Sequence, residues 1–245
     1  MKKYSLALAL VLMIALIPAA TAQDLHKTYN VGSGGSIRIQ NISGDIKIKG
    51  YAGNIITVDA VVVGQDRQLL TIEDLSTPNG VELRAKYPEH SNTSASVNFE
   101  VRVPSLIDYN FERITSVSGH IEIADVRGRL HLNSVSGGIT ATNINGTVSA
   151  KSVSGNVEVD ILSVEGTGDM QFNSVSGNVI VAVPGNLGAS LDMSTLSGSL
   201  ETNFPIQIQE KGFGPGRSAR GTVGARADYN LRLNTISGKV SLTGK

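Results

Sequence analysis

The chain alternates apolar and polar residues in short runs, and these runs recur at a nearly constant interval. After Gly119, apolar residues stand at positions 121, 123, 126, 130, 132 and 135, and Gly137 ends the unit 18 residues after Gly119. The next unit repeats this spacing and ends at Gly155, and the two units after it stretch to 22 and 21 residues while keeping both ends. Spacing by two is typical of a β-strand that buries one face. Each unit therefore predicts two short strands separated by a bend.

The units share a closing phrase of four residues: a small polar residue, an aliphatic residue, Ser and Gly. Its seven copies occupy residues 41–44, 116–119, 134–137, 152–155, 174–177, 195–198 and 235–238. A phrase that returns at a fixed interval indicates one structural unit stacked on itself. We expect Ser-Gly to form a corner, with this Ser bonded to backbone there, and the aliphatic residue to point into the core.

This pattern predicts an all-β fold, a single-stranded β-solenoid (β-helix) with a right-handed coil. Each unit would be one rung, hydrogen-bonded in parallel to the next rung at about 4.8 Å. A β-sandwich of short strands is the alternative that strand spacing alone would also permit. The aligned columns favour the solenoid, because a sandwich has no reason to repeat one residue type at one offset.

Two segments depart from the repeat. Residues 54–103 lack the phrase and hold longer alternating runs, with a turn at Pro78-Asn79-Gly80, so they predict an irregular antiparallel β-meander. This meander would cap the first end of the solenoid, where an open edge would invite aggregation. Residues 203–228 are Gly-rich and predict a flexible loop or hairpin inserted between two rungs. The alternative is a loop that contacts a binding partner.

The first 22 residues predict a signal peptide. Lys2 and Lys3 precede an apolar stretch at 6–17 that is short for a membrane span, and residues 20–22 (Ala-Thr-Ala) form a small-x-small cleavage site. An uncleaved anchor helix is the alternative. We expect residues 23–245 to form a single domain outside the cytoplasm, whether periplasmic, secreted or at the cell surface, with no integral membrane segment.

The composition narrows the function further. The chain has no cysteine, so disulfides cannot hold it together even in an oxidising compartment. Without Lys2 and Lys3, 19 basic residues face 21 acidic ones. This balance gives no electrostatic case for binding nucleic acid or anionic lipid.

The sequence resembles a family of bacterial adhesin-like domains, DUF4097, which is related to DUF2807. The resemblance lies in Gly34-Gly35, in residues 37–46, in the endings 101–104 and 181–184, and in the Ser-Val-Ser-Gly series, and it covers about residues 30–244. It implies an extracytoplasmic β-solenoid from a bacterium. The family has no agreed catalytic residues, so the resemblance assigns none here.

The residues offer little chemistry for an enzyme. The histidines are His26, His90, His120 and His131; the last two stand in columns otherwise filled by polar residues, so both should face solvent rather than bind a metal. Glu122 and Glu158 share a column two rungs apart, or about 10 Å, just outside the spacing of an inverting glycosidase pair. We therefore predict no catalytic residue, no metal site and no cofactor.

We interpret the chain as an exported, non-enzymatic module of the bacterial envelope, an adhesin or interaction domain of unknown ligand. The first and third positions of the phrase would form two hydroxyl-rich ladders able to recognise a repetitive envelope glycan or a protein edge. A β-helix enzyme acting on polysaccharide is the first alternative, and a structural or self-assembling envelope element is the second.

Overall fold

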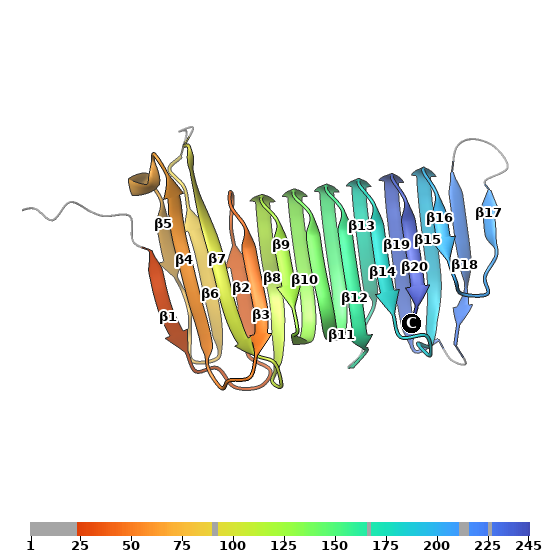
Figure 1. The fold of residues 1–245 in the computed structure, drawn as a ribbon, viewed down its shortest axis with the longest axis horizontal. Coiled ribbons are helices and arrows are strands. Elements are labelled where there is room, and N and C mark those ends of the chain that lie inside the picture. The colour runs from red at the N-terminus through yellow and green to blue at the C-terminus, as the bar shows by residue number, and fades with distance from the viewer. Residues whose placement is uncertain (1–23, 90–92, 166–167, 211–215, 225–226) are drawn as a thin grey trace, which may run out of the picture.

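Strands pair side by side along the length of the molecule and form two facing walls of one sheet (Figure 1). The structure is a computed structural model that describes residues 24–89, 93–165, 168–210, 216–224 and 227–245. The predicted signal peptide, residues 1–22, lies outside this part of the chain. No helix within these ranges is long and apolar enough to cross a bilayer. The prediction of an all-β fold is confirmed.

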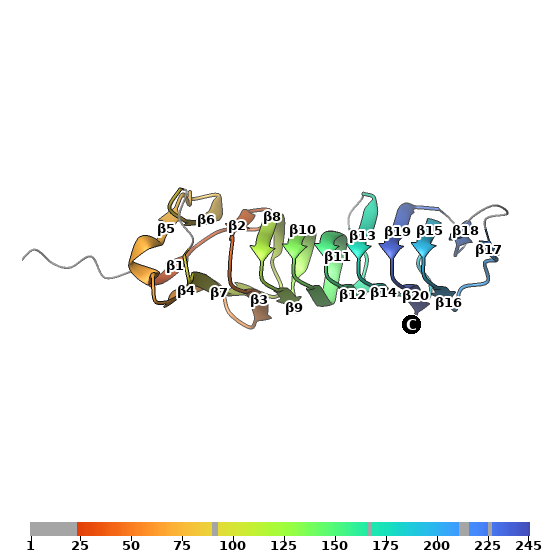
Figure 2. The same cartoon turned by 90° about the horizontal axis from the view of Figure 1, so that it is seen from above.

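Figure 2 shows the two walls from above, and we name them wall A and wall B. Wall A consists, in spatial order, of β5 (Thr71–Asp74), β6 (Gly80–Lys86), β2 (Ser36–Gln40), β8 (Asp108–Ser118), β10 (Arg127–Ser136), the second half of β11 (Ile139–Ser154), β13 (Met170–Ser176), β19 (Tyr229–Ser237), β15 (Ala189–Ser197), β18 (Arg217–Val223) and β17 (Ile208–Glu210). Wall B consists of β1 (Leu25–Tyr29), β4 (Ile56–Gly64), β7 (Ala95–Pro104), β3 (Ile46–Tyr51), β9 (Ile121–Ala124), the first half of β11, β12 (Val157–Ser163), β14 (Val179–Val183), β20 (Val240–Gly244) and β16 (Leu200–Thr202). A short 3-10 helix, η1 (Arg67–Leu69), lies between β4 and β5.

The central rungs stack in parallel and in register, as the repeat predicts. Ser134 pairs with Ser116 on one side and with Ser152 on the other, and Ile139 of wall B lies between Ile121 and Val157. The inward side chains of both walls form one buried aliphatic core. Each rung therefore shares its core with two neighbours, which is how repeat proteins gain stability.

The rungs do not follow chain order at the two ends of the stack. The first rung, β2–β3, lies between β6–β7 and β8–β9, and the last rung, β19–β20, lies between β13–β14 and β15–β16. Figure 1 shows this as dark blue strands placed inside the lighter blue ones. The simple sequential stack that the repeat suggested is therefore wrong at both ends. Both edges of the last rung gain hydrogen-bonded partners in this way, so the C-terminal strands do not form an open edge.

The N-terminal segment differs from the expected meander. Strands β4 and β5 do not pair with each other: β5 pairs antiparallel with β6 in wall A, and β4 pairs antiparallel with β7 in wall B. Strands β6 and β7 then pair in parallel with the first rung. The segment thus extends both walls by one parallel rung and closes each wall with antiparallel strands. The expected turn is present, since Thr77 and Gly80 exchange backbone hydrogen bonds.

The Gly-rich segment forms the hairpin that the sequence predicts, but in space it lies at the end of the stack rather than between two rungs. Its strands β17 and β18 pair antiparallel with each other, and β18 pairs antiparallel with β15 at the far end of wall A. The segment therefore covers the last edge of wall A, at β15. Ala219 and Val223 of β18 are buried and join the core.

Candidate functional site

The first residue of the repeated phrase is buried, and its side chain joins neighbouring rungs. Ser152 Oγ donates a hydrogen bond of 3.0 Å to the carbonyl oxygen of Gly137, on the rung before it. The same bond recurs, at 2.9, 3.1 and 2.9 Å, in the pairs Ser174–Gly155, Thr195–Gly238 and Thr235–Gly177. This column is inaccessible to a ligand, so the expected ladder at the first position is wrong as a binding surface. It is also this residue, rather than the expected Ser before Gly, that bonds to backbone at the corner.

Two members of the same column lack the bond. Ser116 and Ser134 are buried as deeply as the others, yet their Oγ atoms have no hydrogen-bond partner. A buried hydroxyl without a partner costs free energy relative to its hydrated state. The column therefore offers an internal comparison between bonded and unbonded serines.

The glycine of the phrase is required by the close approach of stacked corners. A Cβ on Gly137 would lie 2.1 Å from the carbonyl oxygen of Gly119, and a Cβ on Gly119 would lie 2.1 Å from that of Gly44. Both distances are far inside van der Waals contact with backbone that cannot move aside. Gly44 also has a φ of 103°, a conformation that only glycine adopts readily. The corners can thus stack directly on each other.

A second column stabilises the corner on the wall B side, at the position after the glycine. Asn178 Oδ1 accepts a hydrogen bond of 2.9 Å from the backbone N–H of Lys239 on the next rung. Asp45, His120 and Asn156 accept backbone N–H groups in the same way. His120 Nδ1 accepts from Gly138 N at 3.1 Å, which places the proton of a neutral ring on Nε2. His120 is therefore a structural residue of the corner.

The aliphatic residue of the phrase points outward, contrary to our expectation. Its side chains are 43–50% exposed and form one column, which we name the rim stripe: Ile42, Val117, Val135, Val153, Val175, Ile236 and Leu196 in spatial order. The reason is the two-residue period of a strand. Since Ser134 faces inward with Leu132 and Leu130, Val135 must face outward. The serines at the third position lie beside the stripe and are mostly exposed.

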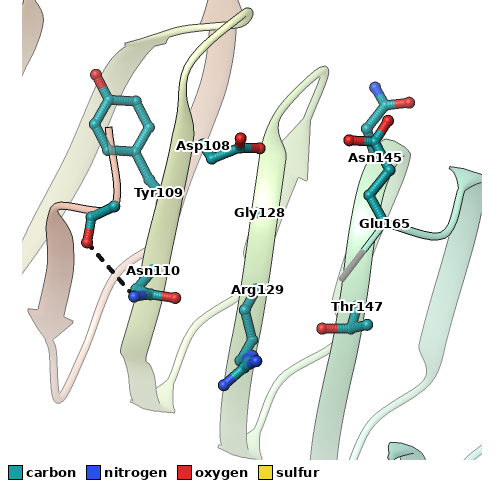
Figure 3. Close-up of a pocket in the computed structure, with 9 residues that line it drawn as sticks. Asp108, Tyr109, Asn110, Gly128, Arg129, Asn145, Thr147 and Glu165 are labelled. Atoms are coloured by element: carbon teal, nitrogen blue, oxygen red, sulfur yellow. Dashed lines mark hydrogen bonds between the residues drawn. The ribbon is translucent and has the colours of Figure 1, made fainter. Parts of the chain in front are cut away.

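The outer side of wall A carries two shallow depressions that adjoin each other. The first, of about 290 Å³, lies across the starts of β8 and β10 and the middle of β11 (Figure 3). It is lined by Asp108, Asn110, Arg129, Thr147 and Glu165 among others. The second, of about 390 Å³, continues toward β13; it shares Arg129 and Thr147 and adds His131, Ser149 and Asp169. Together they form a shallow groove, lined by both polar and apolar groups, across several rungs, which we name the wall A groove. Sequence reasoning missed it, because its residues lie 18 to 22 positions apart in columns whose residue type varies.

The carboxylates of the wall A groove have polar partners. Arg127 Nη1 lies 2.9 Å from Glu165 Oε2, and Asp169 Oδ1 accepts a hydrogen bond of 2.8 Å from Asn230. Burial lowers the pKa of His131, and the charge of Arg129 lowers it further, so this imidazole is neutral at neutral pH. The groove thus presents hydrogen-bonding groups of both kinds without an isolated charge. That combination suits a polar, uncharged ligand.

The other residues weighed from the sequence do not come together. His26 hydrogen-bonds Asp59 at 2.6 Å on the exposed surface of the N-terminal end, and His90 lies outside the described residues. Glu122 and Glu158 both pair with Thr140, which places them two rungs apart as expected. Among the described residues, no group of three or more metal-ligating side chains is gathered at one point.

The repeat, the corner columns and the paired walls can be compared with known proteins. The family model Toastrack DUF4097 matches residues 12–243, nearly the whole chain. The chain belongs to this family. The resemblance found in the sequence is thereby confirmed. No curated protein matches this Toastrack chain.

Two solved structures resemble this Toastrack chain at low sequence identity. A candidate cell adhesion protein from Clostridium sporogenes has 12% identity and a TM-score of 0.47, over 91% of this chain and 100% of that one. A candidate adhesin from Bacteroides fragilis has 13% identity and a TM-score of 0.42, over 92% of this chain and 99% of that one.

Proposed function

We propose that this chain is an exported, non-enzymatic interaction module of the bacterial envelope that holds an extended, uncharged glycan in the wall A groove. The adhesin-like role implied by its family fits this proposal. We also propose that the central rungs form a single-stranded, right-handed coil. We further propose that residues 1–22 are removed on export.

The wall A groove is the observation that carries the proposal. Its two depressions share Arg129 and Thr147, so one extended ligand could occupy both. Its polar side chains recur at the rung interval of about 4.8 Å, which gives a polymer repeated hydrogen-bonding positions on a rigid surface. Because Glu165 is ion-paired with Arg127, it is poorly placed to act as the free acid or base that glycoside hydrolysis needs.

Binding to immobilised envelope polysaccharides tests the proposal. Arg129→Ala and Asp169→Ala should each weaken retention, because each removes a polar group from the groove. Glu122→Ala on the outer side of wall B is the matched control and should bind like the unmodified protein. Equal binding by all variants would refute the role of the groove, and release of reducing sugar by the unmodified protein would refute its non-enzymatic nature.

Two further measurements address export and the partner. N-terminal sequencing of the protein from the envelope fraction should begin at Gln23, whereas a start at Met1 would refute cleavage. A pull-down from envelope extracts should lose its ligand after glycan digestion. Retention of a protein partner through the groove under those conditions would refute the glycan as ligand.

A further inference from the structure

The rim stripe is the most extensive exposed apolar feature of the repeat. Its seven aliphatic side chains lie on consecutive rungs of wall A, each 43–50% exposed. Figure 1 shows the strands from β8 to β15 running nearly parallel with little twist, so the stripe is close to straight. Single exposed aliphatic residues are ordinary, but a continuous strip is typical of an interaction surface.

The surroundings of the rim stripe carry little charge. On one side stand the serines of the phrase, and on the other side stands the next outward column of wall A, which holds Gln40, Thr115, Asn133, Lys151, Asn173, Asn234 and Ser194. Lys151 is the one charged residue in that column. Two such strips can therefore meet without like charges opposing each other along their length.

The area of the strip suits a protein interface. Seven side chains exposed to this extent present roughly 500 Å² of mostly apolar surface, and the adjoining serines bring each partner to about 800 Å². Two such surfaces facing each other would bury about 1,600 Å² in total, the standard size of a specific interface.

The spacing of the stripe identifies the partner. Its side chains repeat at the rung interval of about 4.8 Å, whereas same-face side chains of an extended peptide repeat at roughly 6.8 Å. The side chains of a peptide therefore no longer align with those of the stripe after a few rungs. A second copy of this chain has the same spacing and stays aligned along the whole stripe. A membrane surface is disfavoured because interfacial binding relies on basic residues beside the apolar face, and the adjoining columns supply Lys151 alone.

We propose that the rim stripe is a homodimer interface in which two copies pack stripe against stripe in full register. An isologous pairing of this kind closes on itself and produces a dimer rather than a filament. The two-fold axis runs along the stripe, so Val153, like each of the other six residues, faces its own counterpart, and Lys151 faces the serine column of the partner. The identical side chains then interdigitate as they do in dry interfaces between sheets.

Sedimentation equilibrium of the purified protein across the micromolar range tests the interface. We expect a reversible monomer–dimer equilibrium, and we expect Val153→Lys to weaken it at least about tenfold by placing two like charges at the axis. Ile180→Lys is the matched control, because Ile180 is a 38% exposed aliphatic residue on wall B, and its dimerisation should be unchanged. Thermal unfolding checks that each variant is folded, and Val135→Lys provides a second variant one rung away.

Cross-linking tests the register. The chain has no cysteine, so Val153→Cys introduces a unique thiol. We expect this variant to form a covalent dimer on mild oxidation and Ile180→Cys to form none. Three results would each overturn the proposal. The protein could remain a monomer at every concentration, or its dimer could be unaffected by Val153→Lys. A monomer could also float with phosphatidylcholine vesicles that it binds through the stripe.

Discussion

Replacing Ser152 with Ala isolates the contribution of the corner hydroxyl to the stability of the stack. Ser152 is 4% exposed, and its hydroxyl donates to the Gly137 carbonyl at 3.0 Å. A hydrogen bond of this kind contributes about 1 kcal/mol net, and a buried acceptor left without its donor raises the cost to about 1–3 kcal/mol. Removing one oxygen leaves a cavity too small to add much, so we expect a loss of about 1–2 kcal/mol in the free energy of unfolding.

Ser134→Ala is the matched control. Ser134 stands one rung away in the same column at 5% exposure, but its hydroxyl has no partner. Its removal relieves an unsatisfied buried group, so the free energy of unfolding should change by less than about 0.5 kcal/mol or increase. The difference between the two variants thus reports the hydrogen bond itself rather than the loss of an oxygen from the core.

Urea unfolding followed by circular dichroism measures the difference. The midpoint for Ser152→Ala should fall at an unchanged slope, and its melting temperature should drop by about 2–8 °C, since a domain of this size shifts by about 2–4 °C per kcal/mol. Equal losses for both variants, or a larger loss for Ser134→Ala, would show that the hydroxyl contacts do not determine corner stability.

Three further predictions concern the corner, the N-terminal end and the C-terminal cap. Gly137→Ala should cost several kcal/mol and reduce the folded yield, because its Cβ would clash with a stacked backbone, whereas Gly32→Ala has open space and should leave the melting temperature unchanged. Burial alone would raise the pKa of Asp74, but hydrogen bonds led by that from Lys27 outweigh it and lower the pKa to about 2, so this carboxylate contributes stability above pH 4 that is lost as the pH falls toward 2. Asp74→Asn should flatten that part of the stability–pH curve, and an unchanged curve would refute the assignment. Replacing residues 203–228 with a short Gly-Ser linker should expose the edge of β15 that pairs with β18 and cause aggregation in light scattering, which a clear solution would contradict.

Much of the local structure follows from periodicity. The alternating runs predicted within residues 54–103 form strands β4 to β7, and the central rungs stack as their aligned columns predict. These features depend on neighbouring residues and on a two-residue period, both of which are visible in the chain. The repeated glycine is equally visible, although its reason is the close approach of stacked backbones at corners such as Gly137 rather than the backbone angle alone.

The rim stripe could have been predicted, and hydrophobicity misled the prediction. One face of the strand carries Leu130, Leu132 and Ser134, and the opposite face carries Val135. Assigning Val135 to the core because it is aliphatic breaks the two-residue period. The buried serine satisfies its hydroxyl on a neighbouring rung in most copies, so a polar residue occupies the inward position while an aliphatic residue stays in solvent.

The sequence by itself determined that this protein is a stack of short strands with glycine corners, because strand period and corner chemistry are local properties. The tertiary structure alone decided the order of the rungs and the surfaces that result. Since seven rungs end in the same phrase, the local pattern does not determine which of them become neighbours. In the structure the last rung lies inside the stack, and β18 pairs with the outer edge of β15 in wall A, so neither the C-terminal strands nor β15 leaves an open edge. The wall A groove and the rim stripe result from the parallel, in-register stacking of the rungs, which brings residues 18 to 22 positions apart in the chain into one column.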